Sequence, residues 1–121
     1  MAKTRETGME FCGSGVVPTA QNAMATAGAV SLSTFCTAVN TTTGSGHAST
    51  LGDGARVGQL KKVILVVDAG DLVLTVANMA GGNTVTFADA GDWILLQWDG
   101  VQWVPIEYAG AVDAGPAIST V

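Results

Sequence analysis

The segment from Asn83 to Ile106 constrains the fold of this chain more than any other. Within it, Asp99-Gly100 separates two runs in which apolar residues alternate. Asp-Gly in this position is a strong signal for a two-residue β-hairpin turn, because that turn needs positive φ values. All three Trp residues of the chain lie on this ribbon. The expected cross-strand pairs are Trp98 with Val101, Leu96 with Trp103, and Ile94 with Pro105. Because both faces of such a hairpin are apolar, both need cover, which predicts assembly with other subunits.

The chain carries few charges for its length. Charged residues make up 12% of its 121 residues, against roughly 25% in an average soluble domain. A single small domain with so little charge is expected to cover part of its surface with other subunits. The net charge of −5 and the scattering of the five Lys and Arg residues argue against a nucleic-acid partner, which needs clustered basic side chains.

Neither a membrane segment nor an export signal is predicted. The N-terminal sequence MAKTRETGMEF mixes both signs of charge and lacks the apolar core of a signal peptide. The longest aliphatic run, Val63 to Val67, is too short to span a bilayer. With no sign of an oxidising compartment, Cys12 and Cys36 are expected to be reduced, buried thiols and not a disulfide.

A long stretch without charge distinguishes the N-terminal half. No Asp, Glu, Lys or Arg occurs in the 42 residues from Phe11 to Gly52 (52 − 11 + 1). Alternation from Ala29 to Val39 predicts a strand in this stretch. The portion before it is either an arm that becomes ordered against neighbouring subunits or a flexible linker; the arm is favoured, because an uncharged linker would be poorly soluble. We therefore expect an extended, uncharged N-terminal arm, residues 1–27, and a β domain, residues 28–121.

After Gly58, the pattern is that of β-strands. Strands are predicted at Leu60–Val67, Asp71–Val76 and Asn83–Phe87. The side chains expected to face inward are Leu72, Leu74, Val76, Val85 and Phe87. Short strands separated by turn signals predict an all-β fold, namely a small antiparallel β-sandwich or barrel.

An acidic tetrapeptide, Asp-Ala-Gly-Asp, occurs at residues 68–71 and again at 89–92, and Asp113-Ala114-Gly115 is a fainter third copy. Each copy fits a turn in which the first Asp accepts hydrogen bonds from backbone amides and Gly takes a positive φ. The alternative is a Ca²⁺ site. Because Ca²⁺ takes about six to eight oxygen ligands, which two Asp residues per turn do not supply, we favour turns and predict no metal site.

Catalytic residues are not predicted either. The single His, His47, lies among small residues and is expected in a surface loop. Cys12, Cys36 and His47 lack the spacing of zinc ligands, and the short Gly pairs do not continue as a phosphate-binding loop. We expect a non-enzyme without a cofactor.

The Trp residues allow two interpretations. Trp93, Trp98 and Trp103 either stack on sugar rings or a partner surface, or pack in the core or a subunit interface. Trp103 shares the apolar face of the hairpin with Leu96, which favours its burial, whereas the pattern does not decide the position of Tyr108.

Several short motifs resemble a β module of tailed-bacteriophage virion proteins, found in head-decoration proteins and in head or tail fibres. They are Leu51-Gly52-Asp53-Gly54, Val57-Gly58-Gln59-Leu60-Lys61-Lys62, Gly81-Gly82-Asn83-Thr84-Val85-Thr86-Phe87, Gly91-Asp92 and Leu96-Gln97-Trp98-Asp99-Gly100-Val101-Gln102-Trp103. The resemblance extends over residues 28–104. Residues 1–27 have no counterpart in it.

The resemblance implies an all-β subunit, an intertwined homotrimer, that acts by adhesion. Because 121 residues leave no room for the shaft and tip of a fibre, the chain is most similar to a capsid decoration, or cement, protein. Such a protein would bind the major capsid protein on the outer surface of the phage head after assembly in the host cytoplasm, with no nucleic-acid or membrane partner. The subunit or capsid interface is then expected to include Phe11, Leu32, Phe35, Trp93, Trp98, Trp103 and Tyr108.

Other functions stay open. A receptor- or glycan-binding virion protein of the head- or tail-fibre type would expose Trp93 or Tyr108 to solvent. A cellular trimeric adhesion or scaffold module is a third possibility, and an enzyme would need an acid, a base and a nucleophile converging in one pocket.

Overall fold

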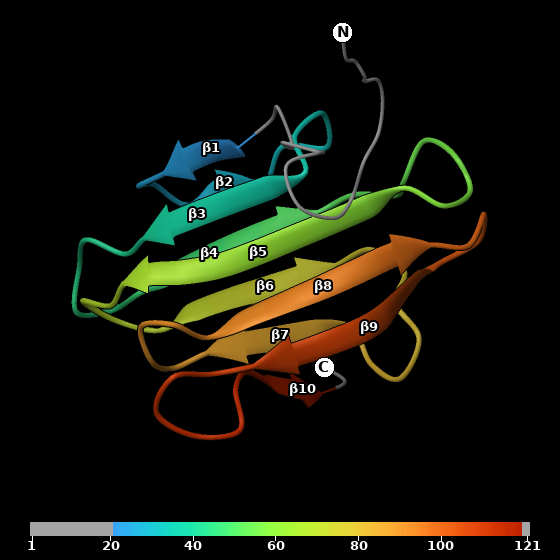
Figure 1. Ribbon diagram of the computed structural model, residues 1–121. Helices are drawn as coiled ribbons and strands as arrows, with labels where there is room; N and C mark the ends of the chain where they lie inside the picture. Colours follow the sequence, from blue (N-terminus) through green and yellow to red (C-terminus); the bar gives the residue numbers. More distant parts are fainter. Residues whose placement is uncertain (1–20, 120–121) are drawn as a thin grey trace, which may run out of the picture.

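Ten strands in two sheets make up the part of the chain that the computed structural model describes, residues 21–119 (Figure 1). Sheet A contains, in spatial order, β1 (Gln21–Met24), β3 (Cys36–Asn40), β5 (Leu60–Val67), β8 (Trp93–Trp98) and β9 (Trp103–Ala109). Sheet B contains β10 (Ala117–Ser119), β7 (Thr84–Phe87), β6 (Leu72–Val76), β4 (His47–Leu51) and β2 (Gly28–Ala29). The predicted all-β fold is confirmed, as a two-sheet sandwich and not a barrel.

Strands β1 to β6 alternate between the two sheets. As a result, β1, β3 and β5 are parallel neighbours in sheet A, and β2, β4 and β6 are parallel neighbours in sheet B. From β6 onward, all new pairings are antiparallel. The prediction of an antiparallel fold is therefore wrong for the first half of the chain. A chain that crosses to the opposite sheet and back returns in its original direction, and local alternation does not reveal such crossings.

The core lies between the two sheets. The predicted strands after Gly58 are confirmed, and β5 spans the predicted Leu60–Val67. Inward and outward positions alternate along β6 and β7 as expected, although Thr84 on the outward side is also buried. The buried apolar residues are Val30, Val39, Leu51, Val63, Leu65, Leu72, Leu74, Val76, Met79, Val85, Phe87, Ile94, Leu96, Trp98 and Trp103.

The β8–β9 hairpin forms in a register shifted from the predicted one. Trp98 pairs with Trp103, and not with Val101, so the loop has four residues. The cause is Asp99: its Oδ1 accepts hydrogen bonds from the N–H groups of Val101 and Gln102, each at 2.8 Å, and these bonds hold its pKa below the usual value. From Trp98 to Leu96 the shift is two residues, which leaves each side chain on its predicted face, whereas beyond a bulge between Leu95 and Leu96 it is three, so that Ile94 pairs with Tyr108. Leu96 and Trp103 are buried, and Val101 is exposed in the loop.

The N-terminal part differs from the prediction in two places. β1 lies inside the expected arm and pairs with β3, so the β domain begins by residue 21; the rest of the arm, including Phe11 and Cys12, falls outside the described residues. The strand expected from Ala29 to Val39 is interrupted, since only its two ends are in strands, β2 in sheet B and β3 in sheet A. The chain crosses between the sheets there, and Val30 is buried at the crossing.

His47 and Cys36 both lie in strands. The prediction of a surface loop for His47 is wrong: it begins β4, is 9% exposed, and its Nε2 lies 3.3 Å from the hydroxyl of Thr42. The backbone N–H of His47 donates a hydrogen bond to the carbonyl of Asp71. The small residues around His47 therefore belong to a strand that lies against the turn at residues 68–71. Cys36 is a free, buried thiol, as predicted.

A buried lysine ties the crossing segment to sheet A. Lys61 on β5 has no exposed surface, and its Nζ donates hydrogen bonds to the Thr37 hydroxyl at 2.7 Å and to the hydroxyl and carbonyl of Thr34 at 2.9 and 3.0 Å. The Thr34 and Thr37 hydroxyls in turn donate to Oδ1 of Asn22 on β1. Loss of hydration on burial lowers the pKa of Lys61 to about 8, against a small opposing effect of Cys36.

Stability should therefore depend on pH through Lys61. Above pH 8 the folded protein releases this proton, whereas the unfolded chain keeps it until about pH 10.5. Unfolding then takes up protons, so we expect the free energy of unfolding to rise by roughly 2–3 kcal/mol between pH 7.5 and 10.5. Urea denaturation of the wild type and of Lys61→Met across this range measures the effect, which the variant should lack. Parallel pH profiles of the two proteins would contradict it.

We predict that Gly54 does not tolerate a side chain, because Trp98 occupies the space next to it. A Cβ at this position would overlap the Cβ and Cγ atoms of the buried Trp98, whereas a Cβ at Gly52 would only touch Leu32 at 3.6 Å. We expect Gly54→Ala to lower the free energy of unfolding by about 1–3 kcal/mol and Gly52→Ala to change it by less than about 0.5 kcal/mol. Denaturation followed by Trp fluorescence measures both; equal effects would show that the space beside Trp98 is not limiting.

Candidate functional site

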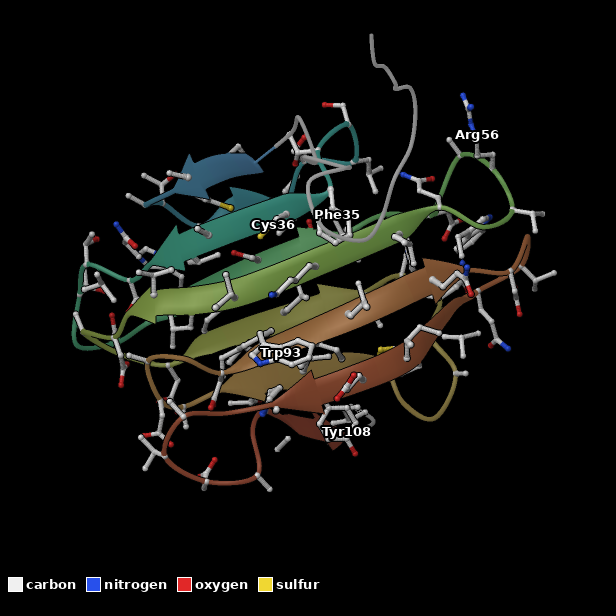
Figure 2. All side chains as sticks on the ribbon, in the orientation of Figure 1. Phe35, Cys36, Arg56, Trp93 and Tyr108 are labelled. Atoms are coloured by element: carbon white, nitrogen blue, oxygen red, sulfur yellow. The ribbon has the colours of Figure 1, made fainter. Side chains whose placement is uncertain are left out.

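The outer face of sheet A carries large apolar side chains in solvent-accessible positions. Cross-strand register places two rows of residues side by side on this face, on strands about 4.8 Å apart. The first row is Ala23, Ala38, Ile64, Trp93 and Ala109. The second row is Cys36, Lys62, Leu95 and Glu107. Figure 2 shows the Trp93 side chain lying on this face, toward the viewer. We call these two rows the outer face of sheet A.

The centre of this face is half-buried, and apolar residues extend beyond it. Ile64, Trp93 and Leu95 are each partly exposed. Val66 on β5 and Ile106 on β9 are also exposed. The face therefore continues as an apolar surface toward the β9 edge of the sheet. Tyr108 on β9 is 46% exposed, but it pairs with the core residue Ile94 and so does not belong to the two rows.

Lys62 covers part of this face. Its Nζ lies 4.8 Å from the centre of the Trp93 ring, within reach of a cation–π contact. Its aliphatic stem lies along the same row as Leu95. The one basic side chain on the two rows thus packs against the aromatic ring and leaves the face largely apolar.

The outer face of sheet B has a different chemistry. Apart from Val73, its outward positions are occupied by alanine and hydroxylated residues, and all of them but the buried Thr84 are at least partly exposed. They are Ala48, Thr50, Val73, Thr75, Thr84, Thr86, Ala117 and Ser119. The difference between the two faces singles out sheet A as the face that has most to gain from a partner.

The residues predicted for an interface are divided by the structure. Trp93 lies on the outer face of sheet A, and Phe35 is partly buried directly before β3. Tyr108 is exposed on the edge strand β9, where it pairs with the core residue Ile94. Leu32 is exposed in the crossing segment, away from that face. Trp98 and Trp103 do not contribute to a surface, because both lie in the subunit's own core, with ring centres 5.4 Å apart in an edge-to-face contact.

Sequence reasoning missed Ile64 and Leu95, the other large apolar residues of this face. The available signal is that β5 and β8 are apolar at consecutive positions, as in Val63-Ile64-Leu65 and Ile94-Leu95-Leu96. Such a strand is covered on both sides. Continuous apolarity alone does not distinguish cover by another layer of the same chain from cover by another subunit.

The acidic tetrapeptides form turns, but not the same turn. At residues 68–71, the N–H groups of Ala69 and Gly70 donate to the hydroxyl of buried Thr41. At 89–92, Gly91 has a φ of 98°, and the last Asp, not the first, accepts the capping hydrogen bonds. The third copy follows the prediction, since Asp113 caps the N–H of Gly115, which has a φ of 110°.

Comparisons with known proteins identify no relative. No protein-family model matches the chain, and a search of curated proteins finds no significant match. Within residues 21–119, no helix is long and apolar enough to cross a membrane.

Proposed function

We propose that this protein is a structural subunit of a tailed-phage virion, a capsid decoration protein that binds the outer surface of the head and stabilises the joints between capsomers. The observation that carries the proposal is the outer face of sheet A, an apolar sheet face on a chain with 12% charged residues. It fits a function in adhesion, in which the protein acts by burying surface and not by chemistry. The motif resemblance to virion β modules supports the same function.

The proposed assembly is a homotrimer that buries the outer face of sheet A between copies. Ile64, Trp93 and Leu95 would supply the apolar centre of each contact, and the ammonium group of Lys62 would stay over the Trp93 ring. The threonine-rich face of sheet B would remain in water. The proposed contact of the trimer with the major capsid protein uses other surfaces, the crossing segment with Leu32 and Phe35 among them.

A charge placed in the centre of the outer face of sheet A should dissociate the trimer. The chain has a mass of 12.2 kDa, so light scattering after size exclusion should give three times that mass for the wild type. Ile64→Glu should give the mass of one chain, because a carboxylate cannot be buried unpaired in an apolar contact. The matched control is Val73→Glu, at an outward position of β6 in sheet B, which should stay trimeric. A monomeric wild type would overturn the trimer, and a trimeric Ile64→Glu would place the interface elsewhere.

The decoration function itself is tested on phage heads. In a phage that encodes this protein, heads that lack it should release DNA at a lower temperature, and added purified protein should bind them and restore the release temperature. Ile64→Glu should bind more weakly than Val73→Glu. Heads that neither bind the protein nor change in heat resistance would overturn the function.

A second candidate is a fibre-type virion protein that binds a glycan or receptor. It is favoured by one observation, the exposure of Tyr108 on the edge strand β9 of sheet A, because aromatic rings at a surface stack on sugars. Tyr108→Ala should then abolish binding of the purified protein to host cells while its binding to heads is unchanged. Undiminished cell binding by the variant would exclude this function for Tyr108.

A further inference from the structure

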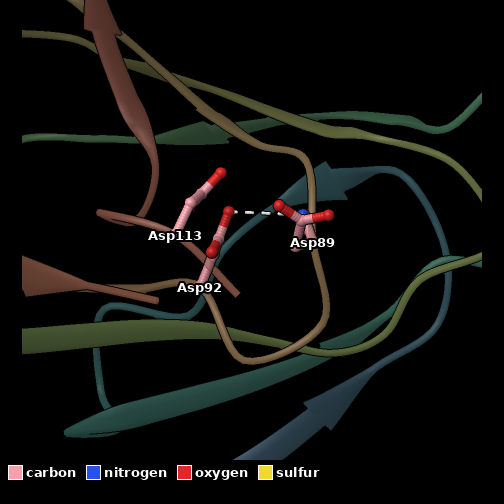
Figure 3. A group of neighbouring side chains, drawn as sticks. All are labelled: Asp89, Asp92 and Asp113. Carbon is pink, nitrogen blue, oxygen red and sulfur yellow. Dashed lines mark hydrogen bonds between the residues drawn. The ribbon is translucent and has the colours of Figure 1, made fainter. Parts of the chain in front are cut away.

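Three carboxylates meet at the end of the sandwich where β7 leads into β8. Asp89 and Asp92 come from the β7–β8 turn and Asp113 from the loop between β9 and β10 (Figure 3). One oxygen of each carboxylate lies within 4.8 Å of one oxygen of each of the others. The second and third copies of the acidic motif, which begin 24 positions apart (113 − 89), are therefore brought together by the hairpin that separates them.

Asp92 is buried with one carboxylate oxygen unsatisfied. Its side chain is 1% exposed, and its Oδ2 accepts hydrogen bonds from the N–H groups of Ala88 and Asp89 at 3.1 and 3.2 Å. Its Oδ1 is buried and has no hydrogen-bond partner in the described part of the chain. Figure 3 shows this side chain pointing toward the other two carboxylates. A buried carboxylate oxygen without a hydrogen-bond partner is unfavourable. Oδ1 of Asp92 is therefore free to bind a ligand that the described part of the protein does not supply.

The surrounding backbone holds the carboxylates in place. Gly110 lies against Oδ1 of Asp92, where a Cβ would overlap that oxygen. Oδ1 of Asp113 accepts a hydrogen bond of 2.9 Å from the N–H of Gly115, which leaves its second oxygen available. Asp92 and Asp113 are thus each fixed through one oxygen.

The charges around Asp89 are all of one sign. Its pKa is raised, first by partial burial, and then by the negative charges of Asp113 and Asp92, a side-chain hydrogen bond with Asp113 and the negative charge of Asp68. Carboxylates at such short separations repel one another unless one of them is protonated or a cation lies between them.

We propose that Asp89, Asp92 and Asp113 form a binding site for a divalent cation, and that the ion is Ca²⁺. Oxygen ligands of the carboxylate type suit a hard cation. Two oxygens bound to one Ca²⁺ at about 2.3–2.6 Å are at most about 5 Å apart, and three oxygens that all lie within 4.8 Å of one another satisfy this limit. Mg²⁺ demands near-octahedral geometry and is usually bound through only one or two carboxylates, so three convergent carboxylates favour Ca²⁺. Water completes the coordination shell.

The sequence argument against Ca²⁺, two Asp residues per turn, does not apply, because Asp113 supplies a third from a distant loop. The bound ion would fix the β9–β10 loop to the turn before β8.

The test is thermal unfolding of the full chain, freed of metal with EDTA, in the absence and presence of 10 mM CaCl₂. We expect Ca²⁺ to raise the Tm of the wild type by about 10 °C if the ion is present at about one hundred times its Kd. Asp113→Asn, at an exposed position where the substitution keeps the fold, should remove this rise. Without Ca²⁺, the same variant should be at least as stable as the wild type, because one of the repelling charges is gone.

Asp71→Asn is the matched control. It makes the same charge change at the end of the first Asp-Ala-Gly-Asp turn, outside the cluster, and should keep the full rise. Calorimetric titration should give one Ca²⁺ per chain for the wild type and no binding heat for Asp113→Asn. A wild type that Ca²⁺ does not stabilise, or an Asp113→Asn variant that keeps the rise, would overturn the site. An equal rise with MgCl₂ would overturn the assignment to Ca²⁺.

Discussion

Trp103 holds the two sheets of this sandwich together at one end. It belongs to β9 in sheet A, yet its indole Nε1 donates a hydrogen bond of 2.8 Å to the carbonyl of Gly52, which follows β4 of sheet B. Its backbone N–H and carbonyl bond to Asn78 and Ala80 in the loop between β6 and β7. One fully buried residue therefore combines apolar packing with three hydrogen bonds, one from its side chain and two from its backbone, that join sheet A to segments next to strands of sheet B.

The two ends of the sandwich use different chemistry. At the Trp103 end, packing dominates, since Trp98 and Trp103 contact each other and Gly54 lies against Trp98 without room for a side chain. At the opposite end, the strands are joined by acidic turns whose amides are capped by Thr41 or by Asp92. On the two rows of the outer face of sheet A, the charged residues are Lys62 and Glu107, and the other positions are uncharged.

The sequence predicts local features of this fold well and long-range features poorly. Alternation identified β5, β6 and β7, and the faces of the β8–β9 hairpin, because each depends on residues that are close in sequence. The hairpin register was wrong by two residues, since it depends on the hydrogen bonds of one side chain, Asp99. The parallel pairings and the burial of His47 were missed, because both depend on which sheet receives each strand.

The candidate sites follow the same division. Trp93 and Tyr108 are expected at an interface although the sequence pattern does not fix their positions. Trp93 lies on the outer face of sheet A, and Tyr108 is exposed on the edge strand β9. Ile64 on β5 is assigned to the same face only because it pairs with Trp93 on the neighbouring strand β8. The cluster of three aspartates forms only because the loop after β9 lies next to the turn before β8. The spacing of the aspartates along the sequence does not predict that contact.

The alternation of β1 to β6 between sheets also determines what a nascent chain can do on the ribosome. Each parallel pair joins residues far apart in sequence, as Cys36 and Lys62 do, and β5 at the centre of sheet A has β8 as its other neighbour. The first half of the protein is synthesised before the strand that closes its sheet exists. Local hairpins form faster than such long-range pairings, so the late β8–β9 hairpin is the natural template on which the earlier strands assemble. A ribosome that stalls before residue 93 would leave an unpaired, apolar β5 edge, which is the kind of surface that chaperones bind and that aggregates form from.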